Sequence, residues 1–368
     1  MNNSVLMISG TYPPKICGIA DYTRLLTHAL CDKDFDITVL SGKSNQQEQW
    51  PVIGMGNHWG FKQLRSILRR VRKTRPAIVH LQYQAGIYND SSAICFLPLM
   101  LRVFTNARII TTFHDLNGPN SWKKLHRLGA IMLLLGSHKC IVCSNRQLSG
   151  LKRLPLIGRK IRQIPVGPTV IPKDISNQRV QLQRDTINIL VFGFIWRKRG
   201  LESVISACSE AAKHGHQIHL TFAGGITDSN YARKLKILSA ALGLDEDQFI
   251  LTGEQSEKQI SRLMRETDFC ILPFPTGVSG GRSTFASCAV HSLPIITTYD
   301  PANCPTELRH GENVLLYKPD DIDELTVCVK NLCSNAELRQ LLATNIGEAV
   351  CNTQWPSIAE AHAHVYEE

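Results

Sequence analysis

The chain has 368 residues, of which 43% are apolar and 20% charged, and its formal net charge is +10 at pH 7. This length exceeds what one hydrophobic core usually supports, so we expect two domains. No apolar stretch reaches the roughly 18 to 20 residues that a membrane-spanning helix requires. The first ten residues have no basic segment before their apolar run, so they predict a buried strand rather than a signal peptide, and we expect a cytoplasmic protein.

Short apolar runs alternate with amphipathic stretches through the first half of the chain. This rhythm predicts a parallel sheet with helices on both faces. In chain order, the expected elements are a strand at Val5–Ile8, a helix at Gly18–Leu30, a strand at Asp36–Leu40, a helix at Phe61–Lys73, and strands at Ala77–Leu81, Ala107–Thr112 and Cys140–Cys143. Three prolines then interrupt the pattern within residues 163–172, which marks the connection between the domains.

The same rhythm restarts after the proline-rich segment. The expected elements are a strand at Asn188–Gly193, a helix at Leu201–Ala212, and strands at Ile218–Ala223, Phe249–Leu251, Phe269–Leu272, Pro294–Thr297 and Val314–Leu316. The predicted fold is α/β, with Rossmann-like domains at residues 1–170 and 171–345 and a closing segment at 346–368. Ligands of such sheets bind where loops leave the carboxyl ends of the strands, so two facing domains would enclose a cleft.

Twelve cysteines are irregularly spaced, and many lie inside apolar runs, as expected of core residues in a reducing compartment. Cys140 and Cys143 form a CxxC pair, which in other contexts indicates a redox or zinc site. Here the pair lies in a strand-like segment with no second pair nearby. We therefore expect both thiols to be buried.

Positive charge is concentrated in the first half. Residues 1–170 hold 23 Lys and Arg against 7 Asp and Glu, whereas the remainder holds 18 against 24. The helix expected from residue 61 to 75 and the segment 152–162 carry much of this excess. An anionic membrane surface is one partner for such a face, and a merely solvated basic face is an equally good interpretation for the helix.

Two loops of the second half follow strands and lead into helices. The first, residues 193–200, contains Gly193, Arg197, Lys198 and Arg199, and three adjacent cations at a helix start could neutralise a diphosphate. Taken alone, such a triplet is better interpreted as a solvated basic loop, and it is the position after a predicted strand, where the cleft is expected, that favours a diphosphate site. The second loop offers backbone amides, one guanidinium and a capping hydroxyl at Ser279, Gly280, Gly281, Arg282 and Ser283.

The first domain offers further candidates at strand ends. His114 stands beside Asp115 where a strand should open into the cleft, although a lone histidine is more often a packing residue. Gly18 lies in the turn that links the first strand to the first helix, where helix amides could bind an anion. His80 and Gln82 lie near the end of another strand, and burial is at least as good an explanation for them.

Together these segments resemble the GT-B glycosyltransferases of family 4, which retain anomeric configuration. The resemblance spans nearly the whole chain, from the glycine turn at 17–19 through the FHD at 113–115 and the basic loop to the closing helix from Gln354. It implies transfer of a hexose from a nucleotide diphosphate sugar to a glycan or polyprenyl-linked acceptor in surface polysaccharide or lipopolysaccharide biosynthesis. It implies that Arg197 and Arg199 bind the diphosphate and that Lys198 is an auxiliary cation. It also implies that His114 contacts a sugar and that no metal or other cofactor is needed.

One departure from the family concerns two glutamates eight positions apart, which commonly contact the donor sugar and its ribose. Ser279 and Ser287 stand at those positions, and Ser292 replaces a glycine. A serine cannot accept hydrogen bonds from two ribose hydroxyls as a carboxylate does, so the donor contacts must differ.

Three other interpretations compete. A nucleotide-sugar epimerase on the same architecture would need carboxylates in the cleft, and the basic loop gives it little support. A nucleic-acid-binding protein would fit the charge, but the chain has no recognition helix or zinc-finger spacing, so no nucleic-acid partner is expected. A catalytically inactive scaffold would explain Ser279 and Ser287.

Overall fold

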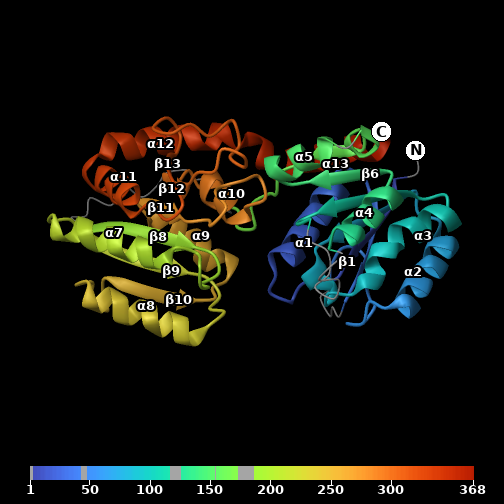
Figure 1. Cartoon of the computed structure of the whole chain (residues 1–368), viewed down its shortest axis with the longest axis horizontal. Helices are drawn as coiled ribbons and strands as arrows, with labels where there is room; N and C mark the ends of the chain where they lie inside the picture. The colour runs from blue at the N-terminus through green and yellow to red at the C-terminus, as the bar shows by residue number, and fades with distance from the viewer. Residues whose placement is uncertain (1–2, 43–47, 117–125, 154, 173–185) are drawn as a thin grey trace. The chain divides into compact units, whose positions relative to one another are not determined.

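The chain folds into two compact units (Figure 1). A computed structural model describes residues 3–42, 48–116, 126–153, 155–172 and 186–368. The first unit comprises Met1–Val166 together with Trp355–Glu368, and the second comprises Gly167–Gln354. The sequence places its boundaries after residues 170 and 345, whereas the units divide after residues 166 and 354.

The first unit is built on a seven-stranded sheet in the order β3-β2-β1-β4-β5-β6-β7. All of its strand pairs are parallel. Its strands are β1 (Ser4–Ser9), β2 (Asp36–Ser41), β3 (Val52–Gly54), β4 (Ile78–Tyr83), β5 (Arg108–Phe113), β6 (Lys139–Val142) and β7 (Ile161–Gln163).

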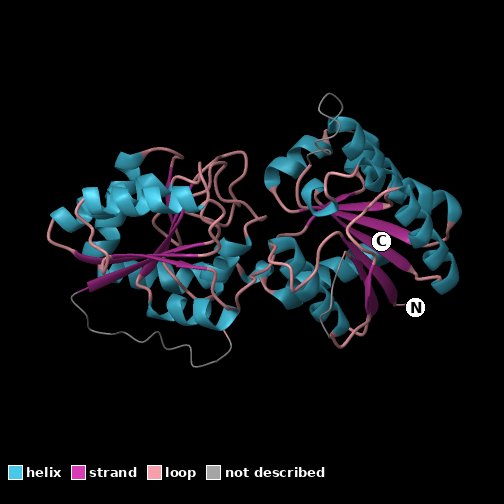
Figure 2. Cartoon of the chain, turned by 90° about the horizontal axis from the view of Figure 1, so that it is seen from below, coloured by secondary structure: helices cyan, strands magenta, loops and turns pink. Residues whose placement is uncertain are grey.

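Helices cover both faces of this sheet (Figure 2). The helices are α1 (Gly18–Cys31), α2 (Phe61–Thr74), α3 (Leu97–Phe104), α4 (His126–Gly136), α5 (Asn145–Lys152), α6 (Pro155–Gly158) and α13 (Trp355–Glu367), with 3-10 turns η1 (Ala85–Tyr88) and η2 (Ser92–Phe96). Buried residues of α2, α3 and α4 share one apolar cluster, and those of α1 and α13 share another. No helix in the described part of the chain has the length and apolarity needed to cross a bilayer.

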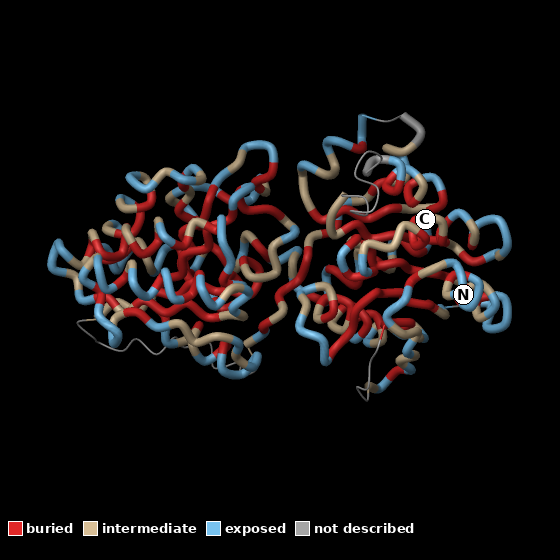
Figure 3. The backbone as a smooth tube through the Cα atoms, turned by 60° about the horizontal axis from the view of Figure 1, so that its bottom comes forward, coloured by how far each residue is buried: buried red, intermediate tan, exposed pale blue. Residues whose placement is uncertain are grey.

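The second unit is built on a six-stranded, fully parallel sheet in the order β10-β9-β8-β11-β12-β13. Its strands are β8 (Thr186–Phe192), β9 (Gln217–Ala223), β10 (Phe249–Gly253), β11 (Phe269–Leu272), β12 (Ile295–Thr298) and β13 (Leu315–Tyr317). The strands β11 and β12 are buried throughout, and β8 and β9 are buried over their last four residues. The burial colouring shows the buried centre of the unit (Figure 3). Such strands are continuous apolar runs because both of their faces are covered.

The helices of the second unit also divide between two apolar clusters. They are α7 (Leu201–Lys213), α8 (Ser229–Ala241), α9 (Glu257–Glu266), α10 (Ser283–Val290), α11 (Ile322–Ser334) and α12 (Ala336–Ala349), with the turn η4 (Cys351–Thr353). Buried residues of α7, α8 and α11 belong to one cluster, and buried residues of α9 and α10 belong to the other.

These elements confirm the predicted α/β class, with two Rossmann-like sheets. Every strand expected from the sequence is present, with its ends shifted by no more than two residues. The strands β3 and β7 were not expected. Each has only three residues at a sheet edge, too few to display a hydrophobic period.

The last helix, α13, returns to the first unit and packs against α1. Trp355 and Ile358 on α13 are buried in the same apolar cluster as Tyr22 and Leu26 on α1. The returning segment is therefore shorter than the expected range 346–368, because residues up to 354 belong to the second unit.

The CxxC pair is buried, as expected. Cys140 lies in β6 and Cys143 directly follows it, and both side chains are almost fully buried. Burial raises the pKa of each thiol to about 12, which disfavours the thiolate that redox and metal chemistry require.

Candidate functional site

The basic loop of the second unit begins at Gly193, directly after β8. The Gly193 backbone has φ +119°, a conformation that side chains other than glycine rarely adopt. A Cβ atom placed at this position would lie 3.1 Å from Nη1 of Arg199 and 3.1 Å from Cγ2 of Thr284. The absence of a side chain at Gly193 therefore lets the basic loop approach the start of α10.

The three cationic side chains of this loop have different surroundings. Arg197 is exposed, and its Nε lies 2.7 Å from Oδ2 of Asp228, while its guanidinium stands 5.4 Å from the ring centre of Tyr231. Lys198 is exposed and adopts φ +66°. Arg197 therefore has a carboxylate partner within the second unit, with which an anion bound by this loop would compete.

Arg199 is buried, with 5% of its side chain exposed. Its Nη2 donates a hydrogen bond to the carbonyl oxygen of Phe192 (2.6 Å), and its Nη1 donates one to that of Phe194 (2.8 Å). These bonds fasten the loop to the end of β8. Burial, together with the nearby positive charge of Arg282, lowers the pKa of Arg199 to about 10, so the guanidinium stays charged at neutral pH.

The second loop brings Arg282 to the same end of the sheet. Its Nη2 donates to Oγ1 of Thr276 (2.9 Å), and its guanidinium stands 4.8 Å from the ring centre of Phe274. Its Nε is buried and has no hydrogen-bond partner among the described residues. A buried charged donor without a partner is rare in folded proteins and often marks a missing ligand or water.

Arg199, which is buried, and Arg282, which is half-buried, thus form a pair of cations beside the first turn of α10, and the charge of Arg282 lowers the pKa of Arg199. The groups that act on the pKa of Arg199 in the described chain are a guanidinium, a thiol and two phenols, and none is a carboxylate. Ser283 and Thr284 begin α10, where backbone amides point away from the helix. Such an arrangement favours binding of an anion, and phosphate and carboxylate groups both match guanidinium geometry. Gly280 and Gly281, just before, leave the backbone accessible.

Ser287, at the position of a family glutamate, is fully buried. Its hydroxyl oxygen accepts hydrogen bonds from the backbone amides of Thr169 (3.0 Å) and Val170 (3.1 Å), and its hydroxyl donates to the carbonyl of Ser283 (2.8 Å). This side chain is therefore saturated by structural bonds. Ser279 is also buried, in the turn just before Arg282, where its carbonyl accepts the amide of Arg282.

The other two predicted residues lie in the first unit. Gly18 begins α1, and His114 directly follows β5. They are connected through α1, because the ring of Tyr22, one turn beyond Gly18, meets the His114 ring edge-on at 4.9 Å between centres. Burial, reinforced by the neighbouring His362, lowers the pKa of His114 to about 3, so this imidazole is neutral at physiological pH.

Two residues that contact the candidate site side chains were not predicted as site residues. Asp228, which pairs with Arg197, follows β9 and caps α8, accepting the amide of Tyr231. An Asp before a helical run is a recognisable capping signal, but no local pattern announces its pairing with a residue 31 positions earlier. Gln82, which bonds His114, was noted only as a strand-end polar residue.

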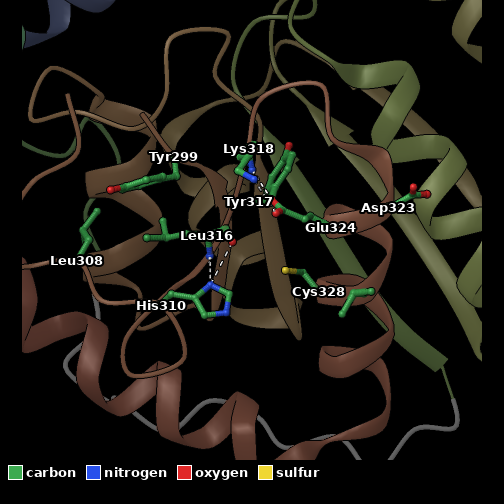
Figure 4. A pocket seen from close by; sticks show the side chains of 10 residues that line it. Tyr299, Leu308, His310, Leu316, Tyr317, Lys318, Asp323, Glu324 and Cys328 are labelled. Carbon is green, nitrogen blue, oxygen red and sulfur yellow. Dashed lines mark hydrogen bonds and ion pairs between the residues drawn. The ribbon is translucent and has the colours of Figure 1, made fainter. Parts of the chain in front are cut away.

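A pocket of about 810 Å³ lies at the edge strand β13 (Figure 4). Its walls come from β13, from the chain before it and from α11, and include Tyr299, Leu308, His310, Tyr317 and Cys328. None of the residues predicted from the sequence lines it. One lining residue, Tyr317, is among the groups that act on the pKa of Arg199.

No group of three or more His, Cys, Asp or Glu side chains within the described ranges is arranged to hold a metal ion.

Comparison with known proteins identifies a family for the second unit. Residues 186–335 match the sequence model of the family described as "Glycosyl transferases group 1". No curated protein matches the sequence significantly.

Solved structures match almost the whole chain. A glycosyltransferase from Rickettsia africae is 19% identical with a TM-score of 0.77, the alignment covering 99% of this chain and 97% of that one. HepE of Anabaena, solved with UDP and glucose, is 14% identical with a TM-score of 0.75 and 99% coverage of both. WaaG, a glycosyltransferase involved in lipopolysaccharide biosynthesis, is 13% identical with a TM-score of 0.68, covering 98% of this chain and 99% of that one.

Proposed function

We propose that this chain, whose residues 186–335 are a group 1 glycosyl transferase domain within a GT-B fold, transfers a hexose from a nucleoside diphosphate sugar to a glycan or lipid-linked acceptor. Within the family resemblance, we assign it to family 4, with retention of anomeric configuration and a role in surface polysaccharide biosynthesis. The lipopolysaccharide role of WaaG supports that pathway class.

The observation that carries this proposal is the buried guanidinium of Arg199 together with the half-buried guanidinium of Arg282 beside the first turn of α10. A departing nucleoside diphosphate gains negative charge, and preorganised cations in a water-poor site stabilise that charge most effectively. The unpartnered Nε of Arg282 would gain an acceptor when the diphosphate binds. Binding of UDP by HepE supports a nucleoside diphosphate as the donor class.

The cations also make a metal ion unnecessary for the departure of the diphosphate. Arg199 and Arg282 supply the charge stabilisation that a divalent cation provides in other transferases. We therefore propose that transfer proceeds without a metal or other cofactor, by front-face attack in which the leaving phosphate accepts the proton of the acceptor hydroxyl.

We further propose that the first unit docks on the anionic inner face of the cell membrane. The helix α2 exposes Lys62, Arg65, Arg69, Arg72 and Lys73. The sequence suggests that Arg162 adds to this positive surface charge. In the structure, however, Arg162 and Lys139 both pair with Glu368. The segment 152–162 therefore contributes less positive charge than its sequence suggests.

Apolar side chains next to α2 strengthen the docking proposal. The helix α4 exposes Leu128, Ile131 and Leu135, which recur on one face at helical spacing, and the neighbouring α3 exposes Val103 and Phe104. Lipid headgroups would attract the cations, and the acyl boundary would accept the apolar side chains.

The transfer proposal is tested by incubating the full chain with radiolabelled UDP-glucose, UDP-galactose and GDP-mannose in EDTA, with and without polyprenyl-diphosphate-linked glycans. Label that moves only when acceptor is present supports a transferase. Inversion at C2 or C4 without transfer would indicate an epimerase, and no turnover would indicate a scaffold.

The site assignment is tested separately with Arg282→Gln, which should weaken UDP binding at least tenfold in calorimetry. The matched control is Arg262→Gln, because Arg262 is an exposed arginine of α9 paired with Glu266. Equal UDP affinities in the two variants would reject the cation pair as the diphosphate site.

The docking proposal is tested by sedimentation with vesicles. The chain should co-sediment with phosphatidylglycerol vesicles and should not co-sediment with phosphatidylcholine vesicles. The double variant Ile131→Ser, Leu135→Ser should reduce sedimentation several-fold, whereas the change Val327→Ser at an exposed site of the second unit should not.

A further inference from the structure

The side chain of Gln82 connects His114 to a set of buried polar groups in the first unit. Its Oε1 lies 3.0 Å from Nε2 of His114. Its Nε2 lies 3.2 Å from the sulfur of Met7 and 3.3 Å from Nε2 of His80. Gln82, Met7 and His80 are all fully buried, so these contacts are not exchanged with solvent.

The thioether of Met7 fixes the orientation of the Gln82 amide. A thioether sulfur can only accept a hydrogen bond, so the amide nitrogen must face it. The amide oxygen therefore faces His114. Because that oxygen can only accept, Nε2 of His114 must carry the hydrogen.

The protonation state of His114 completes the assignment. Its pKa is lowered to about 3, chiefly by burial, so the ring carries one hydrogen at physiological pH. With that hydrogen on Nε2, the Nδ1 atom holds a lone pair. No hydrogen bond to Nδ1 is found among the described residues.

The last helix supports this arrangement from the other side. His362 on α13 donates through Nδ1 to the carbonyl of Ile358 (2.8 Å), so its Nε2 accepts from the hydroxyl of Tyr22 (3.3 Å). The ring of Tyr22 packs edge-on against His114. His80 is held in turn by Tyr366, also on α13.

We infer that Gln82 is a positioning residue that holds His114 as the Nε2–H tautomer, with its Nδ1 lone pair available to accept a hydrogen bond from a sugar hydroxyl. The inference rests on the proposed transferase function for the identity of that hydroxyl. The tautomer itself follows from Met7, Gln82 and His114 alone. A hydroxyl donor suits this site better than a carboxylate or phosphate, because a lone pair on a neutral ring repels an anion.

The experiment that tests the tautomer uses full-length protein with ¹⁵N-labelled histidine. The His114 signals are assigned by their loss in His114→Asn. In the unaltered chain we expect a pyrrole-like Nε2 and a pyridine-like Nδ1. Gln82→Met, which has no acceptor oxygen, should mix the two tautomers.

Kinetics test whether the tautomer matters for transfer. Gln82→Met should lower kcat about tenfold and leave the KM of the nucleotide sugar within twofold. Gln63→Met on α2 is the control for loss of an amide elsewhere in the unit.

The outcomes separate the two proposals. A pyridine-like Nε2 in the unaltered chain, or signals unchanged by Gln82→Met, would overturn the inference whatever the activity. The expected spectra combined with an absence of transfer for every donor would reject the proposed function while leaving the tautomer assignment intact. Expected spectra with unchanged kcat in Gln82→Met would overturn the positioning role.

Discussion

The Nδ1 atom of His80 lies 2.7 Å from the hydroxyl oxygen of Tyr366, although 286 residues separate the two along the chain. This hydrogen bond joins β4, in the middle of the first sheet, to the last helix. Both side chains are buried, so neither group has water as a substitute partner. The end of the chain is therefore part of the first unit's core.

Removing this bond should destabilise the first unit. In Tyr366→Phe the buried His80 nitrogen keeps its position but loses its partner, which costs about 1 to 3 kcal/mol. Urea denaturation, followed by fluorescence of the first-unit tryptophans, measures the difference. The control is Tyr299→Phe, because Tyr299 is 37% exposed and its hydroxyl can bond water, so that change should cost less than about 0.5 kcal/mol. Equal costs would contradict the structural role of the bond.

Acid should destabilise the same core well before its carboxylates titrate. Burial lowers the pKa of His80 well below its usual value and that of His362 to about 4. In the unfolded chain both titrate near pH 6.5, so below that pH the unfolded state binds protons that the folded state excludes. The contribution of these two histidines to the free energy of unfolding is complete above pH 6.5. It decreases as the pH is lowered, by about 2 kcal/mol per histidine at pH 5.

Calorimetric melting between pH 7.5 and 5 tests this expectation. The range avoids Glu368, whose pKa is held at about 2 by Arg162 and Lys139. His362→Gln should reduce the pH dependence of melting by about a third, because the buried His80 and His114 of the same unit contribute in the same way. A melting temperature of the first unit that does not change over this range would contradict neutral burial of these histidines.

The sheets were predictable because their strands are buried on both faces and so form short continuous apolar runs. Phe269–Leu272 is an example, since all four residues are buried and its bounds agree with β11. The edge strands β3 and β7 have no such run, and their pairing depends on neighbours distant in sequence. The division of the chain after Val166 likewise depends on packing rather than on where the prolines lie.

The candidate site was predictable only to the level of loops. Strand-loop-helix patterns located residues 193–200 and 279–283 at one sheet edge, but side-chain directions depend on tertiary contacts. Arg199 turns inward to the carbonyls of its own loop, while Arg197 finds Asp228. His80 and Gln82 looked at least as compatible with burial as with a site. The structure buries both side chains, and Gln82 contacts His114.

Arg197 gives a functional prediction that includes its carboxylate partner. Arg197→Ala should leave folding intact and lower turnover by the equivalent of about 3 to 4 kcal/mol if the guanidinium stabilises the departing diphosphate. Asp228→Asn should act in the opposite direction, lowering the donor KM severalfold, because it frees Arg197 and still caps α8. Steady-state kinetics of both variants checks the pair, and unchanged turnover in Arg197→Ala would remove Arg197 from the site.

Ser287 gives a prediction about the missing glutamate. Ser287→Ala leaves the buried amide of Val170 without an acceptor and should lower the free energy of unfolding by about 1 to 3 kcal/mol. Ser287→Glu should also destabilise, because a larger charged side chain must enter a fully buried site. Ser66→Ala, at an exposed position of α2, is the neutral control. A stable Ser287→Glu variant with tighter nucleotide binding would show that the position still faces the donor.

Gly193 tests how closely the basic loop approaches α10. In Gly193→Ala the new methyl group would lie 3.1 Å from both Arg199 Nη1 and Thr284 Cγ2, on a backbone with φ +119°. Gly215→Ala is a matched control, because Gly215 also has positive φ, +92°, but a Cβ there meets nothing within 4 Å. Backbone strain should destabilise both variants by about 1 kcal/mol or more. Only Gly193→Ala should also displace Arg199, so only that variant should lose UDP affinity in calorimetry. Equal affinities in the two variants would mean that the contact between the loops does not shape the anion site.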